Sequence, residues 1–359
     1  MSTSQEALNL YGLIRKNEGL SYILGIGKSK DQLPVIGRFS PSRIERSSFD
    51  ISAQWQGKSI VFYYWQNNHW VQTKPEFVNL SDIYLRTPFP KRLMNILHDS
   101  CVGMIGIGSM GSKIATGLAR TGIGHLKLAD PDTFSVENIF RHECNLTDLK
   151  RNKARAVKEL IWKINPVIKV DAFPCNIFEN SRLRDMFFNK TNLIIATTDL
   201  VSVQLKVNQE SLRRNIPALY AGCYTEAKGG EVFYVLPGET PLCYESLRTG
   251  TQQEARQKKY RYTNAQNREE YEGEPGLNAA INFVSDVAEQ YAIALLSRHQ
   301  KCQIAKLINP QRNLIFIGGA LGKGFFYLKD KSCFTKPFEF VFPCFTARCS
   351  HCEICRNLK

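Results

Sequence analysis

Three glycines set the strongest constraint on what this chain can fold into. Gly106, Gly108 and Gly111 form the pattern G-x-G-x-x-G, which follows the apolar run VGMI and precedes the helical segment KIATGLARTG. Such glycines let the backbone approach phosphate groups, and the N-terminus of the next helix supplies N–H donors. The spacing therefore predicts a nucleotide-binding α/β fold.

Asp130 ends the next predicted strand, HLKLAD, and is placed to hydrogen-bond a ribose hydroxyl. On these four residues alone, an NAD(P)-dependent dehydrogenase is as good an interpretation as an ATP-binding enzyme. The residues that follow Asp130 must separate the two.

Apolar strands alternate with amphipathic helices from Cys101 onward. This order predicts a parallel, doubly wound, Rossmann-like sheet, in a domain that spans 97–330. Residues 248–276 are polar and have no apolar rhythm, so we expect a long loop there that crosses the nucleotide site. Residues 331–359 form a short C-terminal strand and a cysteine-rich segment.

Residues 1–96 have a different pattern and predict a small α+β domain. A helix is expected over Gln5 to Lys16. The segments FDISAQWQ, KSIVFYYWQ and HWVQTK alternate polar and apolar residues and are separated by Gly57 and by Asn67-Asn68. This pattern is typical of an antiparallel meander.

Composition narrows the class of protein. The 359 residues contain no apolar run near the roughly 20 that a membrane-spanning helix needs, and the N-terminus has no signal-peptide pattern. We therefore expect a cytoplasmic protein that does not bind a membrane. The net charge is +14, but Lys and Arg are spread along the chain, which favours ATP and an anionic substrate over nucleic acid.

The segment after Asp130 supplies the distinguishing pattern. It contains Asn138, Arg141-His142 and then Lys153, and a later apolar strand ends in Asp199. These residues resemble the ThiF/MoeB/HesA family, to which ubiquitin-activating enzymes belong. The resemblance covers roughly residues 96 to 355.

The resemblance implies an ATP- and Mg²⁺-dependent enzyme that converts a carboxylate into an acyl-adenylate. Arg141 and Lys153 would contact the phosphates, Asp199 would bind Mg²⁺, and Asn138 would orient the phosphates or the metal. Two positions depart from the family pattern: His142 stands where glutamine is usual, and Lys150 where glycine often precedes the lysine segment.

The chain has 11 cysteines, four of them in the last sixteen residues. Many family members hold a structural Zn²⁺ between two C-x-x-C pairs, but the first pair is here Cys243 and Ser246. The resemblance implies a zinc site made by Cys243, Cys349, Cys352 and Cys355, with Cys344 or His351 as possible substitutes. The alternative is a site that lost its metal together with the missing thiol.

No cysteine lies in residues 248–276, where related enzymes carry a thioester-forming thiol, and we expect Cys223 to face the core. The layout is similar to the peptide-modifying branch of the family, represented by the microcin and pantocin enzymes. It implies activation of a ribosomally made precursor peptide, held by the N-terminal domain, and acyl transfer to an amine or internal nucleophile without an enzyme thioester.

Two other hypotheses stay open. One is an activating enzyme for a ubiquitin-like or sulfur-carrier protein, and the other is a Rossmann-like protein without adenylating activity. In either enzyme class we expect a symmetric homodimer, because such activation sites are commonly built on paired nucleotide domains.

Overall fold

A computed structural model of the chain describes residues 8–15, 20–27, 35–40, 51–73, 80–224, 226–250, 275–320, 326–328, 331–332 and 334–346. The chain divides into two compact units, described separately below. Unit 1 comprises Met1–Arg86 with Asn165–Val167, and unit 2 comprises Thr87–Ile164 with Ile168–Lys359. In the described part, no helix is both long and apolar enough to cross a membrane.

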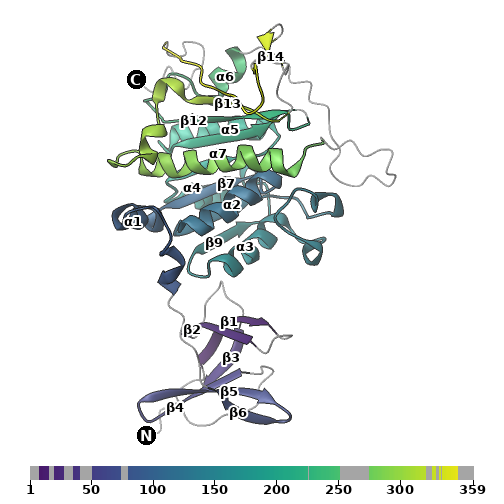
Figure 1. Cartoon of the computed structure of the whole chain (residues 1–359), viewed down its shortest axis with the longest axis vertical. Helices are drawn as coiled ribbons and strands as arrows, with labels where there is room; N and C mark the ends of the chain where they lie inside the picture. Colours follow the sequence, from purple (N-terminus) through teal and green to yellow (C-terminus); the bar gives the residue numbers. More distant parts are fainter. Residues whose placement is uncertain are drawn as a thin grey trace. The chain divides into compact units, whose positions relative to one another are not determined.

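Unit 1 contains a six-stranded sheet of order β2-β1-β3-β4-β5-β6 (Figure 1). The strands are β1 (Leu8–Arg15), β2 (Leu20–Gly27), β3 (Val35–Ser40), β4 (Ile51–Gln56), β5 (Ser59–Gln66) and β6 (His69–Thr73). All neighbours are antiparallel except β3 and β4. A 3-10 helix over Leu80–Tyr84 follows.

The predicted meander is confirmed as β4, β5 and β6. Asn67 and Asn68 both have positive φ, at 50° and 65°, which is the conformation that a tight two-residue hairpin turn requires. The helix expected over Gln5 to Lys16 is wrong, because this segment contains β1. The spacing of its apolar residues fits both the period of a helix and that of a strand. The segment is a strand because it pairs with β2 on one side and β3 on the other.

Unit 2 is built around an eight-stranded sheet of order β16-β13-β12-β11-β10-β7-β8-β9. The strands are β7 (Cys101–Ile105), β8 (His125–Ala129), β9 (Lys169–Phe173), β10 (Leu193–Ala196), β11 (Ala218–Cys223), β12 (Gly229–Val235), β13 (Leu314–Gly318) and β16 (Phe340–Val341). From β9 to β11 all neighbours are parallel. The expectation of a wholly parallel sheet is wrong for β12, β13 and β16, which are antiparallel. A separate two-stranded ribbon pairs β14 (Phe326–Leu328) with β15 (Lys331–Ser332).

Helices cover both faces of the sheet, which confirms the doubly wound Rossmann-like fold. One face packs against α1 (Lys91–Asp99), α2 (Ser109–Thr121), α3 (Lys153–Ile164) and α7 (Asn278–Ser297). The other packs against α4 (Ser181–Phe188), α5 (Val201–Arg213) and α6 (Tyr244–Gly250). Short 3-10 helices occupy Val136–Asn138, Leu146–Asp148, Ile177–Glu179, Ile304–Leu307 and Pro310–Arg312.

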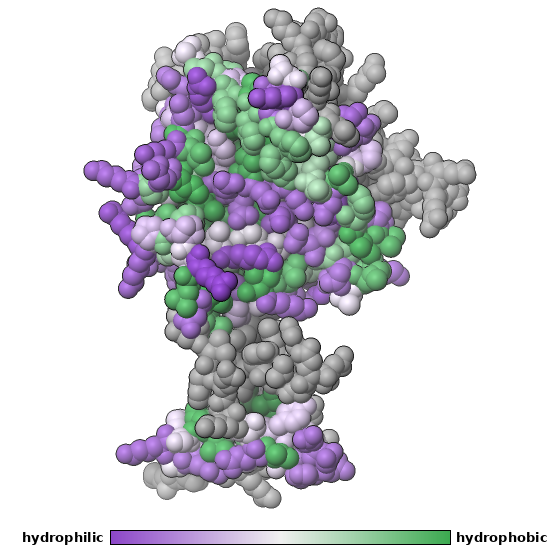
Figure 2. Space-filling view, viewed as in Figure 1, coloured by the Kyte–Doolittle hydropathy of each residue, from purple (hydrophilic) through white to green (hydrophobic). Residues whose placement is uncertain are grey.

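The strand residues alternate strictly between these two cores. In β10, Leu193 and Ile195 join the α2/α7 core, whereas Ile194 and Ala196 join the α4/α5 core. This explains the continuous apolar runs in the sequence, because both faces of each strand are buried. Figure 1 shows α7 and α2 side by side across one face, and Figure 2 shows hydrophilic residues over their outward surface.

Candidate nucleotide-binding site

The glycine loop lies at the carboxyl end of β7, where the sheet changes direction. β8 and β9 follow on one side of β7, and the chain then returns to place β10 on its other side. Open α/β sheets bind ligands in the crevice at such a switch point. The loop therefore occupies the position where a nucleotide site is expected.

Two of the three glycines have a geometric reason. Gly106 has a φ of 89°, and a Cβ there would lie 2.8 Å from the amide nitrogen of Thr198. A Cβ on Gly111 would lie 2.0 Å from the carbonyl oxygen of Gly106. At Gly108 a Cβ would meet nothing within 4 Å, and no side chain caps α2 there. The first-turn amides of a helix have no partner within the helix, so those of α2 can donate to an anion.

Asp130 fixes the glycine loop to the end of β8. Its Oδ2 accepts a hydrogen bond from the Ile107 amide at 2.6 Å, and its Oδ1 accepts one from the Asp132 amide at 2.8 Å. Asn152 Nδ2 donates to the Asp130 carbonyl oxygen at 2.8 Å. Burial raises the pKa of the Asp130 carboxyl, against the opposing effect of nearby Lys153. The contact between Asp130 and a ribose hydroxyl stays a prediction.

Lys153 begins α3, and its ammonium group lies beside the same loop. Its Nζ donates to Asp132 Oδ2 at 2.9 Å, and its side chain is only 12% exposed. The charge of Lys153 also acts on His142, whose Nε2 lies 2.9 Å from the Ile107 carbonyl oxygen. Lys153, Asp132 and His142 therefore surround the glycine loop from the side of β8.

Arg141 and Asn138 come from the segment between β8 and α3. Asn138 ends a short 3-10 helix, and its Oδ1 accepts hydrogen bonds from the amide and the hydroxyl of Ser135, each at 3.1 Å. Its carbonyl oxygen accepts from the amides of Arg141 and His142, at 3.0 and 2.9 Å. Asn138 thus fixes the backbone that carries Arg141.

The charges of Arg141 and Asp199 both act on Cys223, at the carboxyl end of β11. Burial raises the pKa of the Cys223 thiol to about 12; the charge of Asp199 raises it further, and that of Arg141 lowers it. Asp199 is exposed and follows Thr197, whose Oγ1 donates to the Gly106 carbonyl oxygen at 2.6 Å.

The structure describes only some of the predicted metal ligands. Among the described residues, no group of three or more His, Cys, Asp or Glu side chains is arranged to hold a metal ion. Cys243 is buried, and its Sγ lies 3.2 Å from Ser246 Oγ. The other three predicted zinc ligands, Cys349, Cys352 and Cys355, lie outside the described residues. Asp199 suits Mg²⁺, which takes one or two carboxylates together with substrate phosphates and water.

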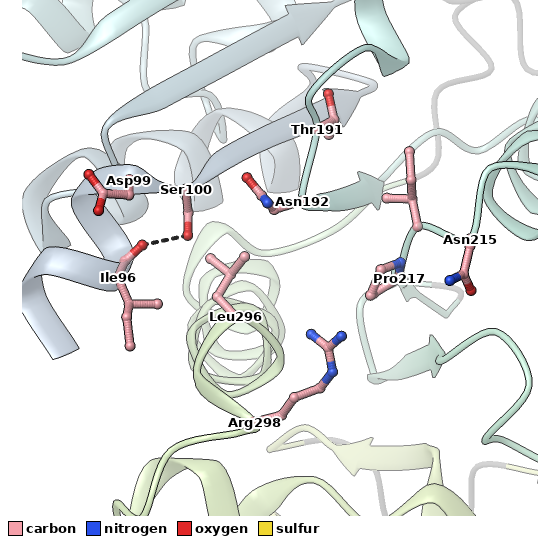
Figure 3. A pocket seen from close by; sticks show the side chains of 10 residues that line it. Ile96, Asp99, Ser100, Thr191, Asn192, Asn215, Pro217, Leu296 and Arg298 are labelled. Carbon is pink, nitrogen blue, oxygen red and sulfur yellow. Dashed lines mark hydrogen bonds between the residues drawn. The ribbon is translucent and has the colours of Figure 1, made fainter. Parts of the chain in front are cut away.

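A separate hollow of about 460 Å³ opens at the opposite edge of the sheet (Figure 3). Ser100, Asn192 and Pro217 line it, and these residues lie at the amino ends of β7, β10 and β11. Arg298, after α7, also lines it. The hollow is therefore distinct from the region around the glycine loop.

Comparison with known proteins identifies the family. The sequence profile of the ThiF family matches residues 82–317, which is more than half of the chain. The chain belongs to the ThiF family. This agrees with the resemblance expected from Asn138, Arg141, Lys153 and Asp199.

Curated relatives match only part of the chain. The sulfur carrier protein ThiS adenylyltransferase of Bacillus subtilis is 32% identical over 156 residues, which are 41% of this chain and 44% of that protein. The ubiquitin-like modifier-activating enzyme 5 of Caenorhabditis briggsae is 26% identical over 153 residues, covering 40% of this chain and 35% of the relative. The chain thus spans less than half of the length of these relatives.

Solved structures of ThiF-like fold match more of the chain. E. coli MccB with ATP has a TM-score of 0.52 at 20% identity, over 73% of this chain and 68% of MccB. A selenomethionine form of PaaA has a TM-score of 0.54 at 15% identity, over 74% of this chain and 80% of PaaA. These similarities support the fold of the ThiF-family unit.

The structure shows several contacts around the candidate site that the sequence did not indicate. Thr197, which bonds to the glycine loop, and Asn152, which joins the loops after β8, carried no motif signal. Asp132 follows Asp130 closely in the sequence, but its ion pair with Lys153 depends on the fold of the intervening residues. Cys223 was expected to face the core; it is half-buried and packs against the α2/α7 core.

Proposed function

We propose that this chain is an ATP-dependent adenylating enzyme that activates a carboxylate of a peptide or small protein. The observation that carries the proposal is the glycine loop at the switch point of the sheet, followed by the start of α2, which no side chain caps. Asp199 lies two residues after Thr197, whose Oγ1 donates to that loop. An acyl-adenylate forms when a carboxylate oxygen attacks the α-phosphate and pyrophosphate leaves. That reaction needs donors and cations around the phosphates, and an acidic residue for the metal.

The residues divide into two groups with different tasks. The amides of α2 and the ammonium of Lys153 bind the phosphates, and Asp132 holds Lys153 in position. Arg141 neutralises charge on the phosphates with its planar guanidinium. Asp199 binds Mg²⁺, which supplies Lewis-acid stabilisation of phosphate charge when it is bound.

The substrate we favour is a ribosomally made precursor peptide, and the acyl group passes to an amine or an internal nucleophile. The fold similarity to MccB supports this choice, since one MccB structure is described as a complex with MccA. Unit 1 offers the sheet edges β2 and β6 for strand addition by such a peptide. Deletion of residues 1–86 should then abolish peptide binding and leave nucleotide binding.

A second candidate is an activating enzyme for a sulfur-carrier or ubiquitin-like protein, which the similarity to ThiS adenylyltransferase and to ubiquitin-like modifier-activating enzyme 5 favours. The state of Cys223 argues against an enzyme thioester at this site, because a thiol with a pKa near 12 is not a nucleophile at neutral pH. Intact mass after incubation with ATP and substrate separates the two. An adduct that a thiol reductant removes would favour the second candidate.

The proposed site is tested first without a partner. Calorimetry with Mg²⁺-ATP should detect binding to the wild type, and Arg141→Ala or Lys153→Ala should weaken it at least about tenfold. Pyrophosphate exchange is then measured with the short peptide or small carrier protein encoded beside the gene. Asp199→Ala should lower exchange by about two orders of magnitude.

Asp99→Ala is a matched control, because Asp99 is an exposed carboxylate at the opposite edge of the same sheet. Its exchange rate should equal that of the wild type. Full activity of Asp199→Ala would contradict the assignment. We also propose a cytoplasmic, symmetric homodimer, and a monomer by light scattering under active conditions would contradict the dimer.

A further inference from the structure

The segment that leads to Asp199 is held at two successive residues. The hydroxyl of Thr197 donates to the Gly106 carbonyl oxygen at 2.6 Å. The carbonyl oxygen of Thr198 accepts a hydrogen bond at 2.7 Å from Nε2 of Gln204, near the start of α5. Asp199 itself is exposed, so the place of its carboxylate depends on these anchored neighbours.

Gln204 is the last member of a chain of hydrogen-bonded side chains. Its Oε1 accepts a hydrogen bond from the hydroxyl of Tyr244, in α6. That hydroxyl accepts in turn from Arg248 Nε at 2.9 Å. Arg248 Nη2 forms an ion pair with Glu231 Oε1 at 2.5 Å. The contacts therefore run without a break from Glu231, in β12, to the carbonyl oxygen of Thr198.

The direction of every hydrogen bond in this chain is fixed by its two ends. An arginine guanidinium only donates, and a carbonyl oxygen only accepts. The Tyr244 hydroxyl therefore accepts from Arg248 and donates to Gln204, whose amide nitrogen is then left to donate to Thr198. Burial raises the pKa of Tyr244, which keeps its hydroxyl protonated. Hydrogen bonds that all run one way polarise each other, and this strengthens the last contact.

Packing holds the members of the chain in place. Three of them are buried: Gln204, Glu231 and Tyr244. The ring of Tyr244 stacks on that of Tyr220, with 4.4 Å between the ring centroids. The guanidinium carbon of Arg248 lies 4.9 Å from the centroid of the Tyr244 ring. Because packing and hydrogen bonding restrict the same side chains, the chain can hold the Thr198 carbonyl group at a fixed place.

We propose that Gln204, Tyr244 and Arg248 are positioning residues for Asp199, and through it for the Mg²⁺ that accompanies ATP. This inference rests on the proposed function of the nucleotide site. The three residues act on the backbone of Thr198, directly before Asp199. Removing an outer partner of a metal ligand typically lowers metal affinity or activity by roughly 10–100-fold.

Two variants each break one link of the chain. Tyr244→Phe removes the hydroxyl between Arg248 and Gln204 and keeps the aromatic ring. Gln204→Met removes the amide that donates to Thr198 and keeps a side chain of similar length. Either variant tests the proposal if the other does not fold.

Tyr234→Phe is a matched control. Tyr234 is also fully buried, and it lies in β12 on the side of the α2/α7 core, whereas Tyr244 belongs to the α4/α5 core. Its hydroxyl donates to the Asn309 carbonyl oxygen at 2.7 Å and accepts from the Asn309 amide at 2.8 Å. Both changes from tyrosine to phenylalanine therefore remove a buried hydroxyl with two contacts, and a loss of stability alone should affect both variants alike.

The test measures binding of ATP to the full-length chain by calorimetry, once with saturating Mg²⁺ and once with EDTA. In the wild type, Mg²⁺ should strengthen ATP binding at least about tenfold. Tyr244→Phe and Gln204→Met should reduce this strengthening to less than about twofold, and should leave binding in EDTA within about twofold of the wild type. Tyr234→Phe should keep the wild-type affinity in both conditions.

Asp199→Ala separates a failure of this inference from a failure of the proposed function. If Asp199→Ala loses the Mg²⁺ effect but folded Tyr244→Phe or Gln204→Met keeps it, the positioning role is overturned and the proposed function stands. If Asp199→Ala keeps the Mg²⁺ effect, the assignment of Asp199 is wrong, and the inference is overturned with it. An equal loss in Tyr234→Phe would also overturn the inference, because destabilisation alone would then explain the result.

Discussion

The ionisation of Glu289 provides a quantitative test of how α7 packs against α2, the helix that follows the glycine loop. Glu289 lies in α7 and points at α2, where a Cβ added to Gly117 would lie 1.8 Å from its Oε2. Burial raises the pKa of Glu289 to about 7; Asp286 also raises it, and Lys113 and Arg120 oppose the shift. The carboxyl is thus packed between two helices with incomplete charge compensation.

The sign of the effect follows from proton binding. The pKa of Glu289 is higher in the folded state than the ordinary 4.5, so the folded state binds the proton more tightly. Stability is therefore highest below pH 4.5, falls as the pH rises to about 7 and is constant above that. At about 1.4 kcal/mol per pKa unit the loss is at most about 3 kcal/mol, and partial solvation reduces this to about 1–2 kcal/mol.

Glu289→Gln keeps the shape of the side chain and removes the ionisation. The variant should be more stable than the wild type by about 1–2 kcal/mol at pH 8, and equal to it within about 0.5 kcal/mol at pH 4.5. Urea unfolding at the two pH values measures the difference. Asp99→Asn is the control, since this carboxylate is 82% exposed and does not act on Glu289.

The control should change the free energy of unfolding by less than about 0.5 kcal/mol at either pH. The reasoning about Glu289 would be refuted if Glu289→Gln were less stable than the wild type at pH 8. That result would mean that Lys113 and Arg120 need the negative charge more than burial disfavours it. An equal stabilisation at both pH values would likewise exclude ionisation as the cause.

Three further predictions concern single sites. Lys150 has a φ of 63°, so Lys150→Gly should stabilise the chain by about 0.5–1 kcal/mol in thermal unfolding, because the relief of strain exceeds the entropy gained by the unfolded chain. Burial lowers the pKa of His142 to about 4, so stability should fall as the pH drops from 6.5 to 4, by at most about 3 kcal/mol, and His142→Gln should remove that slope. Elemental analysis should find close to one zinc per chain, and a folded, active, metal-free preparation would favour the interpretation that the Cys243 site is degenerate.

The sequence predicted the second unit well because both faces of its strands are buried. Continuous apolar runs such as that of β10 leave little choice of structure, and the glycine loop defines the start of α2. The direction of β12 was not predictable in the same way. Buried parallel and antiparallel strands have similar composition, and the sequence after β11 has no strong motif for a reversal of the chain.

In the first unit, local sequence did not predict the structure of β1. The stretch that forms β1 has apolar residues at spacings that fit a helix and a strand alike, and local preference does not choose between them. Pairing with β2 and β3 satisfies its backbone hydrogen bonds from both sides. Such long-range pairing is decided by the sheet as a whole, which one segment of sequence does not contain.

The contact between His125 and Asp171 was invisible in the sequence for a related reason. The two residues lie 46 positions apart, and only the register of the parallel strands β8 and β9 places them together. No local spacing rule predicts that register.

His142 stands where glutamine is usual in the family, and its hydrogen bonds explain how it can replace that residue. Its Nδ1 accepts from the Cys144 amide at 3.0 Å, which requires the proton to be on Nε2. Nε2 then donates to the Ile107 carbonyl oxygen at 2.9 Å, in the glycine loop. A glutamine amide also offers one acceptor and a donor, so the exchange preserves the pair of contacts.

This equivalence holds only while the imidazole is neutral. A second proton on Nδ1 would remove the acceptor that the Cys144 amide needs, and would add a cation near Lys153. The lowered pKa of His142 prevents this at neutral pH, because burial disfavours the charged ring. The same burial makes the glycine loop sensitive to acid in a way that a glutamine would not, so nucleotide binding should weaken below about pH 5 in the wild type and not in His142→Gln.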